Sequence, residues 1–316
     1  MQILVTGAAG FIGSNIALEL QKKYPKAHIV ALDNFDSGTF KNLVNFRGEF
    51  LSGNIADPSL WEYLAENYRF DAVFHQAAIT DTTVMDQDLM VRVNTNAFKY
   101  LLDVAVKRWN AKVIYASSAA VYGNCPAPMK EDGCTKPENV YGFSKLMMDN
   151  IAQRYMDENP DARIVGLRYF NVYGPGEAHK GKFASMVYQL MVKMARGERP
   201  RLFKWGEQKR DFVYIKDVVQ ANMLALERNV SGIFNVGYGK ARSFNELVEI
   251  LNKVLGTDLE IEYFDNPYDF YQNYTEADLT RARNILGYNP QWPLEKGVED
   301  YANRLREMGV LPERKK

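Results

Sequence analysis

The sequence predicts an α/β protein built on a doubly wound parallel sheet, with a smaller mixed α/β substrate-binding domain attached to it. Two observations support this prediction. Apolar strands alternate with helical stretches through the first half of the chain, which is typical of a parallel sheet with helices on both faces. The first strand, residues 3–6, also runs directly into a glycine-rich turn and a helix, as in a Rossmann-like unit. At 316 residues the chain can form one large or two smaller domains.

A turn that contains Gly7, Gly10 and Gly13 follows the first strand. Glycine lets the backbone turn tightly and approach a pyrophosphate, and the free amides of the next helix supply donors and partial positive charge. The spacing is Gly-x-x-Gly-x-x-Gly rather than Gly-x-Gly-x-x-Gly, so a glycine turn without a ligand is the alternative. A second strand at 29–32 supports the ligand, because it ends at Asp33, about 20 residues on, where a carboxylate can bind an adenosine ribose.

Further strands are predicted at 72–75, 113–116 and 164–168, with a helix near 96–108. Parallel sheets bind ligands at the carboxyl ends of their strands. Polar side chains stand at these ends, and we expect them to meet in one crevice: Asp33 and Asn34, Asn54 and Asp57, Gln76, and Ser117 and Ser118.

The character of the chain changes after a Gly/Pro turn at 169–175. The later elements are amphipathic helices at 182–196 and 243–255, a strand and helix at 210–226, and an aromatic loop at 263–274. The expected domains are a dinucleotide-binding domain at 1–170, to which 212–238 returns, and a substrate-binding domain at 171–211 and 239–316. The cleft between them is the expected ligand site.

Composition narrows the classes of function. Lysine plus arginine and aspartate plus glutamate both number 39, so the formal net charge is zero, which disfavours a nucleic-acid partner. No apolar run reaches membrane-spanning length, and the chain starts with a strand rather than a signal peptide, so we expect a cytoplasmic protein without membrane contact. Cys125 and Cys134 are expected to be unpaired thiols in a loop, and with three histidines in the chain no metal site is predicted.

Tyr141 and Lys145 stand four residues apart, which places a phenol and an ammonium one turn apart on a helix face. A tyrosine with its ordinary pKa near 10 is a poor base at neutral pH. A neighbouring cation favours the phenolate and lowers that pKa, so Lys145 would make Tyr141 a usable base. An ordinary helix surface can carry the same spacing, so the pair indicates catalysis only in combination with other motifs of the chain.

Four motifs together resemble the extended short-chain dehydrogenase/reductase superfamily: the glycine turn of residues 6–15, Ser117-Ser118 before 119–123, Tyr141-x-x-x-Lys145, and Arg210-Asp211-Phe212-Val213-Tyr214. The resemblance covers essentially the whole chain. It implies a catalytic triad of Ser118, Tyr141 and Lys145 and a bound nicotinamide cofactor. Residues 168–175 and the His179-Lys180-Gly181 element resemble the ADP-L-glycero-D-manno-heptose 6-epimerases more narrowly.

The narrower resemblance implies an isomerase that interconverts ADP-D-glycero-D-manno-heptose and its L-glycero epimer for lipopolysaccharide core biosynthesis. Carbon 6 has no adjacent carbonyl, so proton abstraction would leave an unstabilised carbanion, which transient oxidation avoids. Tyr141 would serve one face of the carbon and Lys180 the other. A UDP-hexose 4-epimerase and a non-catalytic NAD(P)-binding regulator are the alternatives. A 4,6-dehydratase would need an acid beside Ser118, where residues 119–121 are apolar.

The resemblance carries further residues over one by one. Cofactor contacts are expected from Gly7, Gly10, Phe11, Ile12, Gly13, Asp33, Asn34, Lys41, Gln76, Ala77, Ala78, Asn94, Tyr141, Lys145, Val172 and Lys180. Substrate contacts are expected from Ser118, Asn171, Lys182, Gln189, Phe203, Arg210 and Tyr271. Arg210 suits a nucleotide diphosphate because its planar guanidinium pairs phosphate oxygens bidentately, although an ion pair with Asp211 is the alternative. The expected partner is an ADP-heptose nucleotide sugar, and we expect a homo-oligomer.

The loop after Asp33 leaves the choice of cofactor open. The family favours NADP, and Lys41 could neutralise its 2′-phosphate, although this lysine is displaced from the family position. Asp33 would repel that phosphate, which favours NAD. Trp61 stands near where relatives carry a basic cofactor contact, which weakens the case for NADP further. The family resemblance thus favours NADP and the local charge favours NAD. We expect NADP on the strength of the resemblance, with NAD as the alternative.

Overall fold

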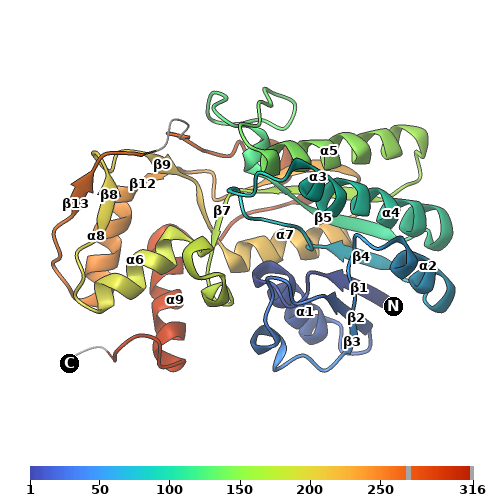
Figure 1. Ribbon diagram of the computed structural model, residues 1–316, viewed down its shortest axis with the longest axis horizontal. Helices are drawn as coiled ribbons and strands as arrows, with labels where there is room; N and C mark the ends of the chain where they lie inside the picture. Colours follow the sequence, from blue (N-terminus) through green and yellow to red (C-terminus); the bar gives the residue numbers. More distant parts are fainter. Residues whose placement is uncertain (268–271, 314–316) are drawn as a thin grey trace.

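The computed structural model of the chain describes residues 1–267 and 272–313, and its central feature is a seven-stranded sheet (Figure 1). The strand order is β11-β6-β5-β4-β1-β2-β3, and every neighbouring pair is parallel. The strands are β1 (Gln2–Thr6), β2 (His28–Asp33), β3 (Glu49–Ser52), β4 (Ala72–His75), β5 (Lys112–Ser118), β6 (Ile164–Tyr169) and β11 (Gly232–Val236). The order reverses between β1 and β4, the topological switch point of a doubly wound sheet. The predicted fold class is confirmed.

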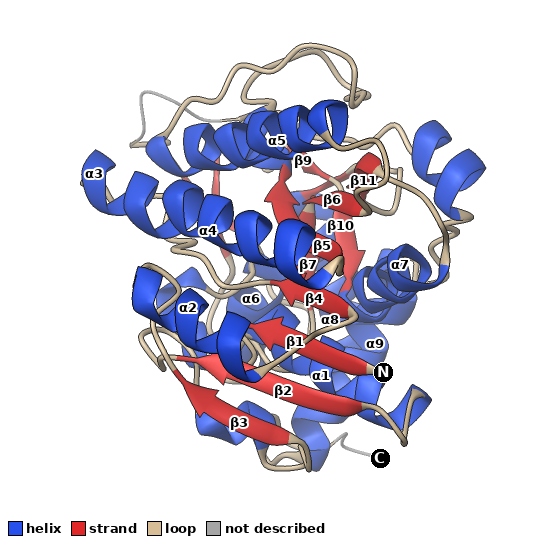
Figure 2. Ribbon diagram, turned by 90° about the vertical axis from the view of Figure 1, so that its right-hand side faces the viewer, coloured by secondary structure: helices blue, strands red, loops and turns tan. Residues whose placement is uncertain are grey.

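Helices cover both faces of this sheet (Figure 2). In β1, Ile3 and Val5 belong to the apolar core shared with α1 and α7, whereas Leu4 belongs to the core shared with α2, α4 and α5. This alternation follows from the two-residue period of a strand. The helices are α1 (Phe11–Lys23), α2 (Pro58–Asn67), α3 (Gln87–Met90), α4 (Ala97–Val104), α5 (Val140–Glu158) and α7 (Ile215–Glu227), with π-helical turns at Val91–Asn96 and Ala105–Trp109. Within 1–267 and 272–313, no helix has both the length and the apolar character needed to cross a bilayer.

The smaller part of the molecule lies to the left of the sheet in Figure 1, where α6 packs on α8 and α8 on α9. Short strands pair there and at the junction, β7 with β10 and β8 with β13 in parallel, and β9 with β12 antiparallel. The bounds are β7 (Asn171–Tyr173), α6 (Met186–Ala195), β8 (Arg201–Phe203), β9 (Lys209–Arg210), β10 (Phe212–Tyr214), β12 (Arg242–Ser243), α8 (Phe244–Leu255), β13 (Glu262–Phe264) and α9 (Leu294–Glu307). The expected division into two domains stays a prediction.

Helix α6 begins later than the predicted helix at 182–196. The Ser185 hydroxyl caps it by accepting a hydrogen bond from the Tyr188 amide at 3.1 Å. The preceding residues Ala178–Phe183 form a separate 3-10 turn, which Gly181 interrupts with a φ of 54°. A side-chain cap of this kind starts a helix because it satisfies an amide that has no partner within the helix. The break leaves a compact loop between β7 and α6.

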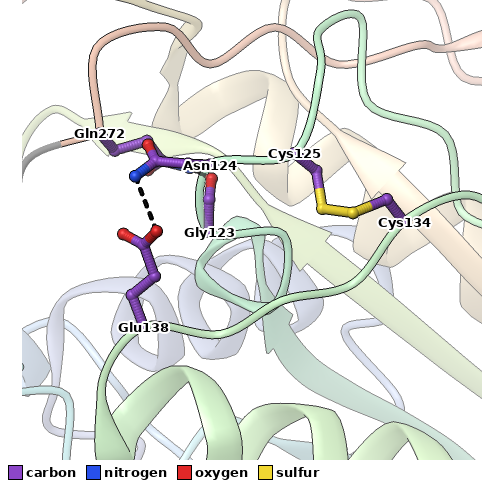
Figure 3. Close-up of a disulfide and its surroundings, with 6 residues drawn as sticks. All are labelled: Gly123, Asn124, Cys125, Cys134, Glu138 and Gln272. Atoms are coloured by element: carbon purple, nitrogen blue, oxygen red, sulfur yellow. Dashed lines mark hydrogen bonds between the residues drawn. A yellow bond between two sulfur atoms is a disulfide. The ribbon is translucent and has the colours of Figure 1, made fainter.

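Cys125 and Cys134 form a disulfide, so the prediction of two unpaired thiols was wrong (Figure 3). Their Cα atoms lie 5.8 Å apart, within the range that a disulfide bridges. The bond closes the loop that joins β5 to α5. Beside it, the Asn124 side chain donates to Glu138 at 2.7 Å, and the Gln272 side chain donates to the Gly123 carbonyl. A nine-residue separation in sequence does not reveal this pairing, because the turn between the two cysteines decides whether they meet.

Candidate active site

A cleft of about 870 Å³ opens at the carboxyl ends of β1, β2, β4 and β5, and the segment from β7 to α6 forms its other wall. Its size lies in the upper part of the range for small-molecule sites. The polar residues expected at the strand ends meet in it, except Asp57, which lies outside: Asp33, Asn34, Asn54, Gln76, Ser117 and Ser118. Topology therefore assembles the crevice that the strand ends predict.

The glycine turn between β1 and α1 packs so closely against itself and against the segment after β4 that side chains would not fit at Gly7 and Gly13. Gly7 has a φ of +66°, and a Cβ there would lie 2.6 Å from the Ala77 amide nitrogen. A Cβ on Gly13 would collide with the Gly7 carbonyl. Helix α1 has no side-chain cap at Gly10 and no acidic residue in its first turn. Its first amides are thus free to bind an anionic group such as a pyrophosphate.

Asp33 lies at the end of β2, where the cleft would receive an adenosine ribose. Its carboxylate is 7% exposed and accepts hydrogen bonds from the amides of Ala9 and Phe35, both at 2.8 Å. A second carboxylate, Asp36, lines the same end of the cleft. Lys41 is exposed and is not among the residues that line the cleft.

Trp61 lies in the core rather than at a cofactor contact. It is buried on α2, and its indole N–H donates to the Ile55 carbonyl at 2.8 Å. Its side chain is therefore committed to packing α2 against the sheet.

Ser118, Tyr141 and Lys145 meet in the cleft, from the end of β5 and the first two turns of α5. The Asn139 side chain starts α5 by accepting from the Gly142 amide at 2.7 Å, which orients the Tyr141 turn. Ser118 contacts the Tyr141 hydroxyl, and the Lys145 ammonium lies 5.8 Å from the centre of the Tyr141 ring. The ammonium donates to the Ala116 carbonyl at 2.8 Å.

The electrostatics of this trio differ from the expected ones. Burial raises the pKa of Tyr141 and the Ser118 hydrogen bond opposes that rise, so the net direction is opposite to the lowering predicted from Lys145. Lys145 is 1% exposed, and burial lowers its pKa to about 8, while Asp149 one turn along α5 opposes that fall. At Tyr141 the effect of burial on the pKa outweighs that of the Ser118 hydrogen bond, and at Lys145 it outweighs the attraction of Asp149.

Two buried polar atoms in the cleft wall have no hydrogen-bond partner among the described residues: the Gln76 amide nitrogen and the Ser117 hydroxyl. The Gln76 carbonyl oxygen accepts from the Tyr169 hydroxyl at 3.2 Å, which fixes the direction of the amide. Buried polar atoms are normally hydrogen-bonded, so these two indicate a ligand with its own donors and acceptors. Together with the glycine turn, they fit a nicotinamide dinucleotide.

Lys180 lies in the 3-10 turn Ala178–Phe183 and lines the cleft together with His179 and Phe183. Burial lowers its pKa, and the carboxylate of Glu177 opposes that fall. The cleft therefore contains two groups of the acid–base type, Tyr141 and Lys180, from separate segments of the chain.

Most predicted site residues line the cleft: Gly7, Gly10, Phe11, Ile12, Gly13, Asp33, Asn34, Gln76, Ala77, Ala78, Ser118, Tyr141, Lys145, Asn171, Val172 and Lys180. Lys41, Asn94, Lys182, Gln189, Phe203 and Arg210 do not line it, and Tyr271 lies outside the described residues.

Asn94 is fully buried rather than open to the cleft. Its side chain accepts from the Ile79 amide at 2.8 Å and donates to the Ser144 hydroxyl at 3.0 Å, so it ties the loop after β4 to α5. The Gln189 amide donates to the Ala184 carbonyl at 2.7 Å.

Two of the expected substrate residues pack against aromatic rings. The Phe203 ring packs on Phe264 at 4.9 Å. Arg210 is buried with its guanidinium 5.8 Å from the Phe244 ring, and Phe244 itself lines the cleft.

Sequence reasoning missed an apolar wall of the cleft: Ile79, Val84, Leu89 and Val93 after β4, Met186 in α6, Phe212 in β10 and Phe244 in α8. The position of Ile79 and Val84 just beyond a strand end was the available signal. Met186, Phe212 and Phe244 come from elements whose packing against the sheet the sequence pattern does not reveal.

The sequence profile of the NAD dependent epimerase/dehydratase family matches residues 3–237. The chain belongs to this family. An ADP-L-glycero-D-manno-heptose-6-epimerase of Helicobacter pylori is 47% identical, with 96% of each chain covered and a TM-score of 0.90. A UDP-glucose 4-epimerase of Thermotoga maritima is 31% identical, with 98% of this chain and 99% of that chain covered and a TM-score of 0.90.

A third structure of the epimerase/dehydratase type contains a bound nucleotide. The UDP-glucuronic acid 4-epimerase of Bacillus cereus, solved with UDP-glucuronic acid and NAD, is 29% identical, with 98% of this chain and all of that chain covered and a TM-score of 0.84. These findings confirm the resemblance that the motifs indicate, to a nucleotide-sugar epimerase of the NAD dependent epimerase/dehydratase family.

Proposed function

We propose that this epimerase interconverts ADP-D-glycero-D-manno-heptose and ADP-L-glycero-D-manno-heptose, for the heptose of the lipopolysaccharide core. The observation that carries the proposal is that Lys180 and Tyr141 line one cleft. An enzyme that inverts a carbinol carbon through a ketone needs an acid–base group for each epimer, because the hydroxyl points to opposite sides in the two. The similarity to the heptose epimerase of Helicobacter pylori supports the choice of sugar.

Each residue of the cleft has a role in this proposal. When bound, the nicotinamide ring accepts hydride from carbon 6 and returns it to the opposite face of that carbon. Tyr141 exchanges the hydroxyl proton of one epimer, and Lys180 that of the other. Ser118 donates a hydrogen bond to the ketone oxygen, where charge changes during the reaction. Lys145 holds the nicotinamide ribose and favours the phenolate of Tyr141 once the ligands are bound.

The remaining cleft residues hold the cofactor. The first amides of α1 bind the pyrophosphate beside Gly10, and Asp33 binds the adenosine ribose. Gln76 and Ser117, which line the cleft and each carry an unpaired polar atom, would hold the nicotinamide end of the cofactor. In this arrangement the first amides of α1, the Gln76 amide nitrogen and the Ser117 hydroxyl would each gain a hydrogen-bond partner.

We infer NAD rather than NADP as the preferred cofactor. Two carboxylates, Asp33 and Asp36, line the ribose end of the cleft, and their negative charges would repel a 2′-phosphate. Among the described residues that line the cleft, Lys145 and Lys180 carry cationic side chains, and this proposal assigns both to the chemistry at carbon 6, whereas Lys41 lies outside the cleft. NADP, the cofactor expected from the family, stays the alternative. Denaturing the purified protein and identifying the released nucleotide by mass decides between them.

The activity is tested by incubating the protein with ADP-D-glycero-D-manno-heptose and following the L-glycero epimer by chromatography or NMR. UDP-glucose and UDP-galactose serve as the second pair of substrates. Turnover of the heptose pair alone supports the proposal. Turnover of the hexose pair alone identifies a 4-epimerase, and nucleotide binding without turnover of either pair identifies a regulator.

A further inference from the structure

Glu177 is a buried carboxylate directly next to the proposed acid–base loop. It is 1% exposed, and three donors hydrogen-bond to it. One oxygen accepts from the Gly174 amide at 3.0 Å and from the Ser185 hydroxyl at 2.9 Å, and the other accepts from the Ser185 amide at 2.5 Å. All three groups donate, which matches the ionised carboxylate and opposes the rise in pKa that burial causes.

These bonds close the loop between β7 and α6 at both of its ends. Gly174 follows β7 directly, and Ser185 is the residue that caps α6. Lys180 lies between them, and its amide donates to the Glu177 carbonyl at 2.9 Å. The Glu177 side chain thus fixes the entry and the exit of the segment that carries Lys180 into the cleft, and the Glu177 backbone carbonyl fixes its middle.

Few charged side chains besides Lys180 lie near the Glu177 carboxylate. The titratable side chains that face it from packed elements are Tyr173 of β7, Tyr188 of α6 and Tyr301 of α9. The pKa of each of these tyrosines is raised, so all three are neutral near pH 7. On its own loop the interacting cation is Lys180.

Lys180 in turn faces His179, whose pKa is lowered mainly by burial, so the neighbouring imidazole is neutral near pH 7. Lys180 is half-buried in the cleft wall, and the Glu177 carboxylate is the anion acting on its ammonium. The two residues stand three positions apart on one short loop and, among the described residues, form no direct ion pair, so each charge favours the charged form of the other group through space.

We propose that Glu177 is a positioning residue for Lys180, holding the loop closed with its hydrogen bonds and keeping the Lys180 side chain protonated with its charge. This proposal rests on the proposed function, in which Lys180 exchanges a proton with the substrate. A lysine that must return a proton to the sugar has to be charged at that step, although burial favours its neutral form. Glu177 offsets that burial without contacting the substrate.

The direct test measures the pKa of Lys180 without using turnover. Trace labelling with acetic anhydride across pH 6–11, read by mass spectrometry, gives the reactivity of each lysine. In Glu177→Gln we expect the apparent pKa of Lys180 to fall by roughly half to one pH unit, because the anion that favours the ammonium is gone. Lys182, exposed two residues further on, is the internal control and keeps its titration.

Ser185→Ala and Glu177→Asp separate charge from loop closure. Ser185→Ala removes one donor and keeps the carboxylate, so the pKa of Lys180 stays at the parent value. Glu177→Asp keeps the charge on a shorter side chain, so the pKa stays within roughly 0.3 of the parent value while kcat falls. Either variant keeps the proposal testable if Glu177→Gln does not fold.

Kinetics give a second, independent result. In Glu177→Gln we expect kcat to fall roughly tenfold with unchanged NAD affinity, and the alkaline limb of the kcat profile to move to lower pH. An unchanged Lys180 titration in Glu177→Gln, or an equal fall in Ser185→Ala, would overturn the role of the charge. If the parent protein lacks heptose epimerase activity, the proposed function fails, and the labelling result still decides the link between Glu177 and Lys180.

Discussion

Lys145 is buried at the expense of stability, and this can be measured. Its pKa is lowered to about 8 from 10.5, so between these values the unfolded chain binds a proton that the folded protein has released. Each pH unit between the two pKa values is worth about 1.4 kcal/mol, so keeping the ammonium charged in the folded protein costs roughly 3 kcal/mol. The cost is fully present below pH 8 and disappears as the pH rises toward 10.5.

Replacing this lysine by methionine removes the buried charge and keeps an unbranched side chain. The Ala116 carbonyl then loses the donor that it has at 2.8 Å, which costs about 1 kcal/mol. Asp149 keeps its partners, Arg168 at 2.9 Å and the Tyr115 hydroxyl at 2.8 Å. We therefore expect Lys145→Met to stabilise the cofactor-free protein by roughly 2 kcal/mol at pH 7 while it abolishes turnover.

The assay is urea unfolding of cofactor-free parent and variant at pH 7, 8, 9 and 10. Other groups that titrate in this range are common to both proteins and cancel in the difference. The parent should gain roughly 2.5 kcal/mol relative to Lys145→Met between pH 7 and pH 10. Stability curves that run parallel over this range would refute the reasoning, because they would mean that Lys145 titrates alike in the folded and unfolded chain.

Three further predictions address the site and the fold. Tyr141→Phe should lower kcat by roughly two to four orders of magnitude with NAD affinity retained, as measured by turnover and by titration calorimetry; near-normal turnover would exclude Tyr141 as the proton acceptor. Asp33→Asn should reduce the preference for NAD over NADP by about tenfold, whereas Lys41→Ala should leave that preference unchanged; the reverse pattern in the two dissociation constants would show that Lys41 reads the phosphate. Reduction of Cys125–Cys134, or Cys134→Ser, should lower the free energy of unfolding by roughly 2.5 kcal/mol, the value for closing a loop of this length; equal urea midpoints with and without reductant would contradict it.

Most strands of the sheet could be predicted from the sequence because buried parallel strands appear as continuous apolar runs. Residues 3–6, 29–32, 72–75 and 113–116 all fall inside strands of the structure. β3 was missed, since Glu49–Ser52 is an edge strand whose residues are exposed or only partly buried, so no continuous apolar run marks it. The disulfide was missed for a different reason, because no periodicity encodes the path of an irregular loop.

The cofactor side of the site was more predictable than the substrate side. Glycine turns and strand ends act locally, so the cleft contains Gly7, Asp33 and Gln76 as expected. Gln189 and Arg210 come from segments that reach the sheet only through tertiary packing, and the structure has them beside the cleft rather than in its wall. Which residues face a ligand there depends on how α6 and α8 pack, which a single sequence does not specify.

Inversion at carbon 6 through hydride transfer within the cleft is the central claim, and an isotope label tests it most directly. The protein is incubated with ADP-D-glycero-D-manno-heptose that carries deuterium at carbon 6, in ordinary water, and the product is analysed by NMR and mass. The L-glycero epimer should form with the deuterium retained at carbon 6, because the hydride that leaves the carbon also returns to it without exchange with solvent. Loss of the deuterium to water, or the absence of the L-glycero epimer, would contradict the claim.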